Sequence, residues 1–134
     1  MFDENKLLRI DIAKEAKGVY VIKLIGRIDS DTYGHMDMKV RPLLTSSTRV
    51  IILDMDKVDY VSSAGLGVIF GIKNFLEGNK GSLIISSLKP HVKKVFEVVK
   101  ALPTENVFES REELDAYLDV IQKKEIEKQK GKGN

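Results

Sequence analysis

The sequence predicts a single α/β domain in which a mixed sheet of about four to five strands carries four helices packed on it. Two observations predict this class. The N-terminal part holds two stretches of alternating apolar and polar residues joined by a glycine turn, and the rest holds short apolar runs that alternate with longer stretches of helical spacing. The length of 134 residues is enough for one domain with its own core and too short for two.

The N-terminal part predicts a β-hairpin followed by a helix. Residues 8–12 and 19–24 alternate apolar and polar side chains, which is typical of half-buried strands. A Lys-Gly pair at residues 17–18 lies between them as a tight turn, so the two strands should pair. Residues 31–46 then show helical spacing, although Pro42 disfavours a helix interior.

The remaining chain predicts strands that alternate with helices. Residues 49–54 form a short β-branched apolar run, which is typical of a central strand buried on both faces, and we expect a loop over residues 55–62 after it. The later elements are an apolar helix over residues 63–77, a buried strand over residues 82–86, a helix opened by Pro90, a short extended stretch at residues 106–108 and a last helix that begins at the capping box of Ser110 and Glu113.

The composition excludes several kinds of function. The chain has no cysteine, which removes disulfides, thiolate nucleophiles and cysteine-based zinc sites. Its two histidines, His35 and His91, fall in separate predicted helices, are expected on their surfaces and form no ligand pair. No apolar run approaches the ~20 residues of a bilayer span, and the N-terminus has acids where a secretory signal has bases. We therefore expect a cytoplasmic protein with no catalytic residue and no metal site.

Charge is distributed unevenly along the chain. The net charge is +2, and residues 123–134 hold five lysines and two glutamates, which leaves residues 1–122 at −1. We therefore divide the chain into a domain at residues 1–122 and a basic C-terminal tail at residues 123–134 that is expected to be disordered or frayed. No aromatic residue interleaves with the tail lysines, so we expect neither a nucleic-acid partner nor a membrane partner.

One segment, residues 60–67 (YVSSAGLG), has the features of a modification site. Its two hydroxyls lie where the predicted loop becomes a helix, and its small residues would let a partner surface approach the backbone closely. A phosphate here would add about −1.5 to −2 charge, which the free N–H groups of a helix N-terminus tolerate. From these features alone two interpretations stay open: a phosphorylation site, or ordinary capping serines with glycines for close packing.

Neighbouring residues suggest other chemistries that are weaker. Asp54, Asp56 and Asp59 follow the predicted central strand, as a phospho-accepting or metal-binding aspartate would, but their spacing does not match an EF-hand loop. Acids in this position commonly solvate a loop. The glycines of the segment do not form a dinucleotide fingerprint, because Gly71 lies one position too far along the chain.

The chain resembles the anti-sigma factor antagonists, the small stand-alone STAS domains of bacterial partner-switching systems. Residues 53–68 (LDMDKVDYVSSAGLGV) are similar to the acidic loop and the D-S-[SA]-G-L-G-like turn of that family. Residues 24–29 (LIGRID) resemble its G-x-[IL]-D element, and residues 86–96 (SSLKPHVKKVF) resemble its strand-to-helix segment. The resemblance covers roughly residues 6–120 and implies a STAS-like single domain.

The resemblance also implies a set of site residues. The phospho-acceptor serine of the family falls on Ser63, and Ser62, which stands where many members have aspartate, is a rival acceptor. The residues expected to bind the partner are Asp29, Asp54, Asp56, Asp59, Ser62, Ala64, Gly65, Leu66 and Gly67.

The family mechanism implies the partners. The unphosphorylated protein would bind an anti-sigma factor, an ATP-binding serine kinase with a histidine-kinase-like fold, and so free a sigma factor for transcription. Phosphorylation at Ser63 would release the anti-sigma factor, and a PP2C-type phosphatase would reset the switch. The nucleotide would belong to the kinase, so this chain would be a non-enzymatic monomer or weak dimer without a cofactor. Two alternatives remain. One keeps the fold and makes the chain a STAS scaffold or accessory subunit of a signalling assembly or lipid transporter. The other is an enzyme, either a small hydrolase or an aspartyl-phosphate receiver using Asp54.

Overall fold

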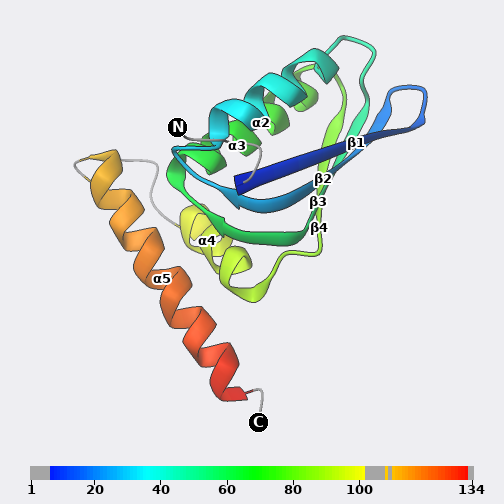
Figure 1. Cartoon of the computed structure of the whole chain (residues 1–134). Coiled ribbons are helices and arrows are strands. Elements are labelled where there is room, and N and C mark those ends of the chain that lie inside the picture. Colours follow the sequence, from blue (N-terminus) through cyan, green and yellow to red (C-terminus); the bar gives the residue numbers. More distant parts are fainter. Residues whose placement is uncertain (1–6, 102–107, 109, 133–134) are drawn as a thin grey trace.

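The computed structural model describes residues 7–101, 108 and 110–132. These residues form a four-stranded mixed sheet in the order β1-β2-β3-β4, with helices packed against it (Figure 1). The expected α/β class and the mixed sheet are confirmed. None of the helices in the described ranges is long and apolar enough to cross a membrane.

The sheet is built from one hairpin and two parallel additions. β1 (Leu8–Ala16) pairs antiparallel with β2 (Val19–Ile28), as the alternation predicted. Their turn requires Gly18, whose φ is +76° and where a Cβ would lie 2.6 Å from the carbonyl oxygen of Ser47. β3 (Val50–Val61) then pairs parallel with β2, and β4 (Ser82–Ser86) pairs parallel with β3.

The helices follow the predicted order. The α-helix α2 ends where Pro42 enters, and the chain continues there as a 3₁₀ turn because proline lacks the N–H that an α-helix interior needs. α5 runs along α4, and its C-terminal part extends past the sheet (Figure 1). The bounds are α2 Tyr33–Val40, the 3₁₀ turn η1 Arg41–Leu43, α3 Ser63–Gly78, α4 Pro90–Ala101 and α5 Arg111–Lys132.

The core lies between the helices and one face of the sheet. Along β3, Ile51, Leu53 and Met55 are fully buried, whereas the residues between them are partly exposed. α3 supplies a matching apolar stripe to this core. The fully or nearly fully buried residues of the two helices that cover β3 and β4 are Leu66, Ile69, Ile72 and Leu76 from α3 and Val92 and Val95 from α4.

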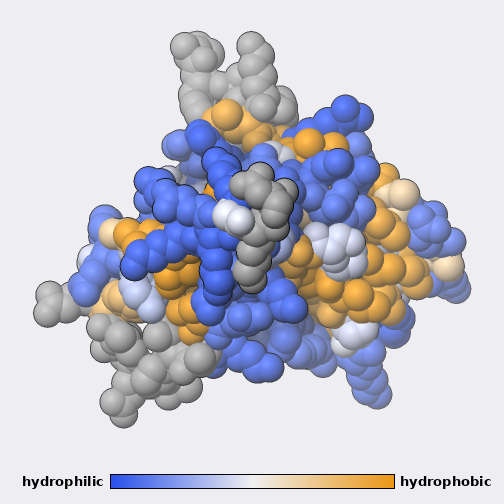
Figure 2. All heavy atoms as spheres, turned by 90° about the horizontal axis from the view of Figure 1, so that it is seen from below, coloured by the Kyte–Doolittle hydropathy of each residue, from blue (hydrophilic) through white to orange (hydrophobic). Residues whose placement is uncertain are grey.

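The opposite face of the sheet corrects the expectation that the central strands are buried on both faces. Val21, Ile52 and Ile84 lie side by side across three strands, and Ile84 is 47% exposed. Because alternate strand residues point to opposite faces, this row lies away from the core, and it is not fully covered by the described residues. Apolar surface also remains between hydrophilic regions on the side seen from below (Figure 2).

The expected loop over residues 55–62 is wrong, since β3 continues to Val61. Met55, Val58 and Val61 are fully buried, while Asp56 and Asp59 between them are exposed. The pairing with β2 shifts register twice along this stretch, which accommodates the irregular spacing of buried residues. Asp56 and Asp59 are therefore solvent-exposed residues of β3 and do not belong to a loop.

Three smaller expectations also have outcomes. His35 is only 7% exposed, so the expected surface position of this histidine is wrong. The extended stretch at residues 106–108 falls mostly outside the described residues. Residues 123–132, expected as disordered or frayed, continue α5 as helix in the structure. The division of the chain into residues 1–122 and residues 123–134 stays a prediction.

Candidate functional site

Ser62 is the N-cap of α3. Its backbone is extended, its Oγ accepts a hydrogen bond from the N–H of Gly65 at 3.4 Å, and its own N–H donates to the carbonyl oxygen of Ile28 at 2.9 Å. The residue is 5% exposed. Serine is favoured at this position because its side chain satisfies a free N–H of the first helical turn. The hydroxyl of Ser62 therefore has a structural role as the cap of α3.

Ser63 is the first residue of α3 and its hydroxyl is differently placed. The Oγ of Ser63 is buried and has no hydrogen-bond partner in the structure as described. Leaving a buried hydroxyl unpaired costs about 1–3 kcal/mol, so this group calls for an explanation. The backbone N–H of Ser63 donates to Oδ1 of Asp115 on α5 at 2.8 Å.

The glycines after Ser63 have two different surroundings. A Cβ on Gly65 would lie 2.7 Å from the carbonyl oxygen of Ile28, so this position admits no side chain without a shift of β2. Nothing lies within 4 Å of a Cβ built on Gly67 or on Gly71. Gly65 therefore serves close packing inside the domain, and Gly67 and Gly71 leave open space on the surface of α3.

A groove of about 570 Å³ runs from Ser63 between α2 and α3. Its apolar wall comes mainly from α3, and its polar rim includes an exposed ion pair between Asp37 and Arg41 with a 2.6 Å separation. Arg111, the first residue of α5, lines the same groove. The other lining residues are Tyr33, Leu44, Ser63, Ala64, Gly67, Val68, Gly71, Ile72 and Phe75.

α5 also holds the end of β3, just before Ser62. The side chain of Gln122 is 1% exposed, its Nε2 donates to the carbonyl oxygen of Val61 at 3.0 Å, and its Oε1 accepts from the N–H of Val61 at 3.1 Å. Leu118, one turn earlier, is fully buried. α5 is thus bonded to the backbone on both sides of Ser62.

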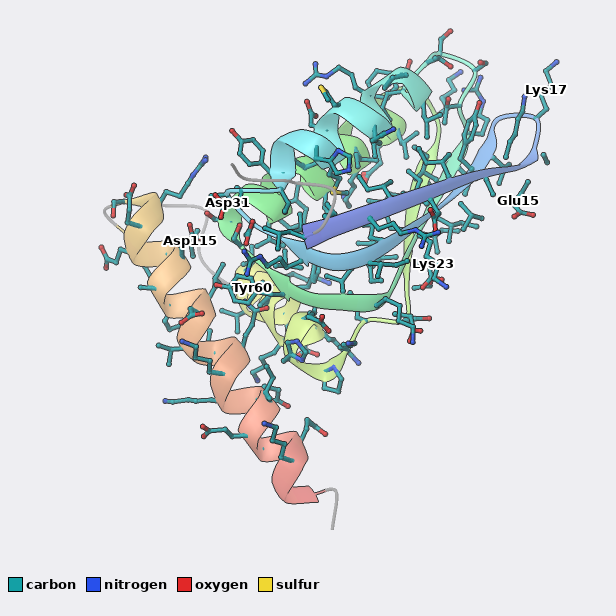
Figure 3. All side chains as sticks on the ribbon, in the orientation of Figure 1. Glu15, Lys17, Lys23, Asp31, Tyr60 and Asp115 are labelled. Atoms are coloured by element: carbon teal, nitrogen blue, oxygen red, sulfur yellow. The ribbon has the colours of Figure 1, made fainter. Side chains whose placement is uncertain are left out.

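The surroundings of this end of the sheet are acidic. Burial, followed by the charge of Asp119 and a hydrogen bond to it, raises the pKa of Tyr60 to about 12, and the charges of Asp115 and Asp29 act in the same direction. Figure 3 shows Tyr60, Asp31 and Asp115 at the end of the sheet where α5 passes, while Lys17 lies at the far hairpin end. Asp29 itself pairs with Arg27 at 2.9 Å. No group of three or more potential ligands in the described ranges is arranged to hold a metal ion.

The structure separates the acidic residues that the sequence grouped with Ser63. Asp54 lies on the outer sheet face beside Lys23 and Ser86, seven residues before the end of β3 at Val61, which is roughly 23 Å along a strand at ~3.3 Å per residue. Asp56 is exposed on the same strand, and Asp59 pairs with Lys89 at 2.5 Å. The carboxylate that contacts Ser63 comes instead from Asp115.

Sequence reasoning missed Asp115 and Gln122. Both belong to the face of α5 that packs on the domain, because Asp115, Leu118 and Gln122 follow the spacing i, i+3, i+7. The sequence offered one signal for such a residue: Gln122 is polar but has the spacing of the apolar residues on this face of the helix. It indicates a buried partner but does not say which one.

Comparisons with known proteins agree with this architecture. The STAS domain family model matches residues 12–114. BtrV of Bordetella bronchiseptica, described as an anti-sigma factor antagonist, is 33% identical over 95 residues, which cover 71% of this chain and 82% of BtrV. The anti-sigma-B factor antagonist of Staphylococcus aureus is 28% identical over 79 residues, covering 59% of this chain and 73% of that protein.

Solved structures show the same fold. The anti-sigma factor antagonist SpoIIAA in its unphosphorylated form aligns with a TM-score of 0.62 at 23% identity, covering 68% of this chain and 80% of that one. The phosphorylated form of the Bacillus protein aligns with a TM-score of 0.58 at 22% identity, covering 67% and 82%.

Proposed function

Since the chain belongs to the STAS domain family, and to the anti-sigma factor antagonists within it, we propose that it acts by partner switching through Ser63. The unphosphorylated protein binds an anti-sigma factor and frees a sigma factor for transcription. The anti-sigma factor is itself a serine kinase with a histidine-kinase-like ATP site, and it transfers the γ-phosphoryl group of ATP to Oγ of Ser63. A PP2C-type phosphatase hydrolyses the phosphoserine and resets the switch.

The observation that carries this proposal is the contrast between the two serines. The hydroxyl of Ser62 caps α3, whereas the hydroxyl of Ser63 has no partner in the described structure. Modifying Ser62 would remove the cap, at a cost of about 1 kcal/mol, and would also require room in a site that is only 5% exposed. Modifying Ser63 removes no hydrogen bond of its side chain. This difference supports Ser63 as the acceptor.

The groove between α2 and α3 supports a place for the partner. It begins at Ser63, its lining includes Ala64 and the open surface at Gly67, and α3 supplies most of its apolar residues. A helix or loop of the anti-sigma factor seated there would pass directly over Ser63. A dianion at that end would have to be desolvated in the complex, and a loss of about 3 kcal/mol lowers the affinity roughly a hundredfold.

The proposed partner surface is narrower than the sequence suggested. Ala64 and Gly67 line the groove, and Gly65 and Leu66 are buried beneath it as its support. Asp29 and Asp59 lie with Tyr60 around a second hollow at the same end of the sheet. Asp54 and Asp56 stand too far along β3 to act on a phosphate at Ser63 across water and salt.

The experiment is phosphorylation by candidate partners. Histidine-kinase-like ATPases encoded in the same genome are purified and incubated with this protein and ATP, and the phosphate is mapped by mass spectrometry. We expect phosphate on Ser63, none in Ser63→Ala and undiminished transfer to the Ser63 of Ser62→Ala. Transfer to another residue, or to none with any candidate, contradicts the proposal.

Binding to the same kinase gives an independent check. Ser63→Ala should bind as tightly as the unmodified protein, and the protein with phosphoserine at position 63 should bind about a hundredfold more weakly. Gly67→Trp is the variant for the groove and should bind the kinase more weakly, because a Cβ built on Gly67 meets nothing within 4 Å and the residue lines the groove. Binding of Gly67→Trp as tight as that of the unmodified protein would refute the groove as the partner site, and equally tight binding of the phosphoserine protein would refute the switch.

A further inference from the structure

We propose that Asp115 is a positioning residue that holds the start of α5 against Ser63, and that a phosphate on Ser63 breaks this contact and frees the first turns of α5. This inference rests on the proposed function, since it concerns the state of Ser63. It adds a second consequence of the same modification: besides the change in the partner groove, the C-terminal helix changes its attachment.

The contact itself is short and charged. Oδ1 of Asp115 accepts the N–H of Ser63 at 2.8 Å, so a carboxylate of α5 sits at the first free N–H of α3. A hydrogen bond of this kind to an ionised acceptor is stronger than a neutral one, and the positive end of the α3 dipole adds to it. Arg111, one turn before Asp115, lines the groove together with Ser63. The start of α5 therefore lies beside the residue that is modified.

In the unmodified protein the contact to Asp115 lies next to the acceptor hydroxyl. The Oγ of Ser63 is buried while its own backbone N–H is bonded to α5. A kinase has to bring the γ-phosphorus of ATP within bonding distance of Oγ, which a buried hydroxyl does not allow. Since Asp115 and Arg111 of the first turns of α5 lie beside Ser63, we expect opening of these turns to expose the acceptor.

A phosphate on Ser63 makes closure unfavourable. It adds about −1.5 to −2 charge to Ser63, the residue whose N–H the Asp115 carboxylate accepts. The charges of Asp115, Asp119 and Asp29 already raise the pKa of nearby Tyr60. Arg111 offers one compensating positive charge. The phosphate oxygens also compete with Asp115 for the N–H of Ser63, because a helix N-terminus binds phosphate well. Repulsion and competition both displace Asp115.

The rest of α5 remains attached while its start opens. Gln122 is bonded to both backbone groups of Val61, and Leu118 is fully buried. Leu114 packs only partly against the core. The movement is therefore confined to about the first two turns of α5, and the bonds at Val61 act as the fixed point.

The test is amide hydrogen exchange in a double-mutant cycle. Four full-length proteins are compared: serine or genetically encoded phosphoserine at position 63, each with Asp115 or with Asp115→Asn. The asparagine keeps an acceptor for the N–H of Ser63 and removes the charge. The informative amides are those of residues 115–118, whose helical acceptors lie in the first turn of α5.

The expected result is specific to the charge. Phosphoserine should speed exchange of these amides about tenfold with Asp115 and less than threefold with Asp115→Asn. Amides of β3 at residues 51–55 should exchange alike in all four proteins, which reports intact folding. Glu112→Gln is the matched control, since it removes an exposed charge from the same turn and should leave the effect of phosphoserine at about tenfold.

Two results would overturn the inference. One is unchanged exchange of residues 115–118 on phosphorylation, and the other is an equal effect of phosphoserine with Asp115 and with Asp115→Asn. Because the phosphoserine is encoded, neither result depends on a kinase. Failure of the proposed function would instead appear as the absence of phosphate transfer from a kinase to Ser63. The hydrogen-exchange comparison would still test the effect of phosphoserine on α5.

Discussion

Replacing Gln122 by alanine should lower the free energy of unfolding by about 2–4 kcal/mol. The side chain is 1% exposed and bonds to both the N–H and the carbonyl oxygen of Val61. Alanine leaves these two backbone groups buried without partners, and each such group costs about 1–3 kcal/mol. Val61 immediately precedes the N-cap of α3, so the loss should also loosen the segment that carries Ser63.

Urea unfolding followed by far-ultraviolet circular dichroism measures this effect, with the slope of the transition checked for two-state behaviour. Gln129→Ala is the matched control on the same helix. Its side chain is partly buried, and in the described part of the chain its amide donates to the carboxylate of Glu125, one turn away, so its loss should change the unfolding free energy by less than about 0.5 kcal/mol. If Gln122→Ala cost no more than Gln129→Ala, the attachment of α5 to the end of β3 would be refuted.

Three further predictions concern the same region. Gly65→Ala should destabilise the domain by about 1–3 kcal/mol in urea unfolding, because its Cβ meets the β2 backbone, whereas Gly67→Ala, with open space around it, should lose no stability. Ser110→Ala removes the cap that accepts the N–H of Glu113 at 3.1 Å and should cost about 1 kcal/mol in the same assay. In a spectrophotometric titration of the four tyrosines, the transition near pH 12 should disappear in Tyr60→Phe. Because the pKa of Tyr60 is raised on folding, the stability it contributes is present below pH ~10 and is lost as the pH rises through about 12.

The local elements of this fold could be predicted from the sequence because local spacing determines them. The alternation in residues 8–12 and 19–24 corresponds to the hairpin, and the apolar run of residues 63–77 corresponds to α3. The same logic failed for β3. Its second half has acids on a sheet face that is open to water, and two register shifts break the alternation, so a strand had the composition of a loop.

The C-terminal segment shows a different failure. Its lysines and glutamates suggested a frayed tail, but both residue types favour helix, and spaced pairs such as Lys123 with Asp119 at 2.9 Å stabilise one. The partners of the polar residues on α5 could not be predicted. The bonds of Asp115 to Ser63 and of Gln122 to Val61 join side chains to backbone groups across 52 and 61 residues, and no local pattern encodes such a pairing.

The two α5 contacts place the proposed switch residue, Ser63, next to a helix that the serine motif alone does not indicate. α5 makes two hydrogen bonds around Ser63. Gln122 accepts the N–H of Val61, two residues earlier, and the charged Asp115 accepts the N–H of Ser63 itself. A phosphate on Ser63 would therefore act on α2, α3 and α5 together, since the groove and the start of α5 meet at this residue. Asp115→Asn separates the two consequences: it removes the electrostatic effect on α5 and leaves the phosphate at the groove. In the phosphoserine protein this variant should bind the anti-sigma kinase as weakly as the protein with Asp115, because desolvation of the dianion in the groove is unchanged. Recovery of tight binding on Asp115→Asn would mean that release of α5, and not the charge in the groove, drives dissociation of the partner.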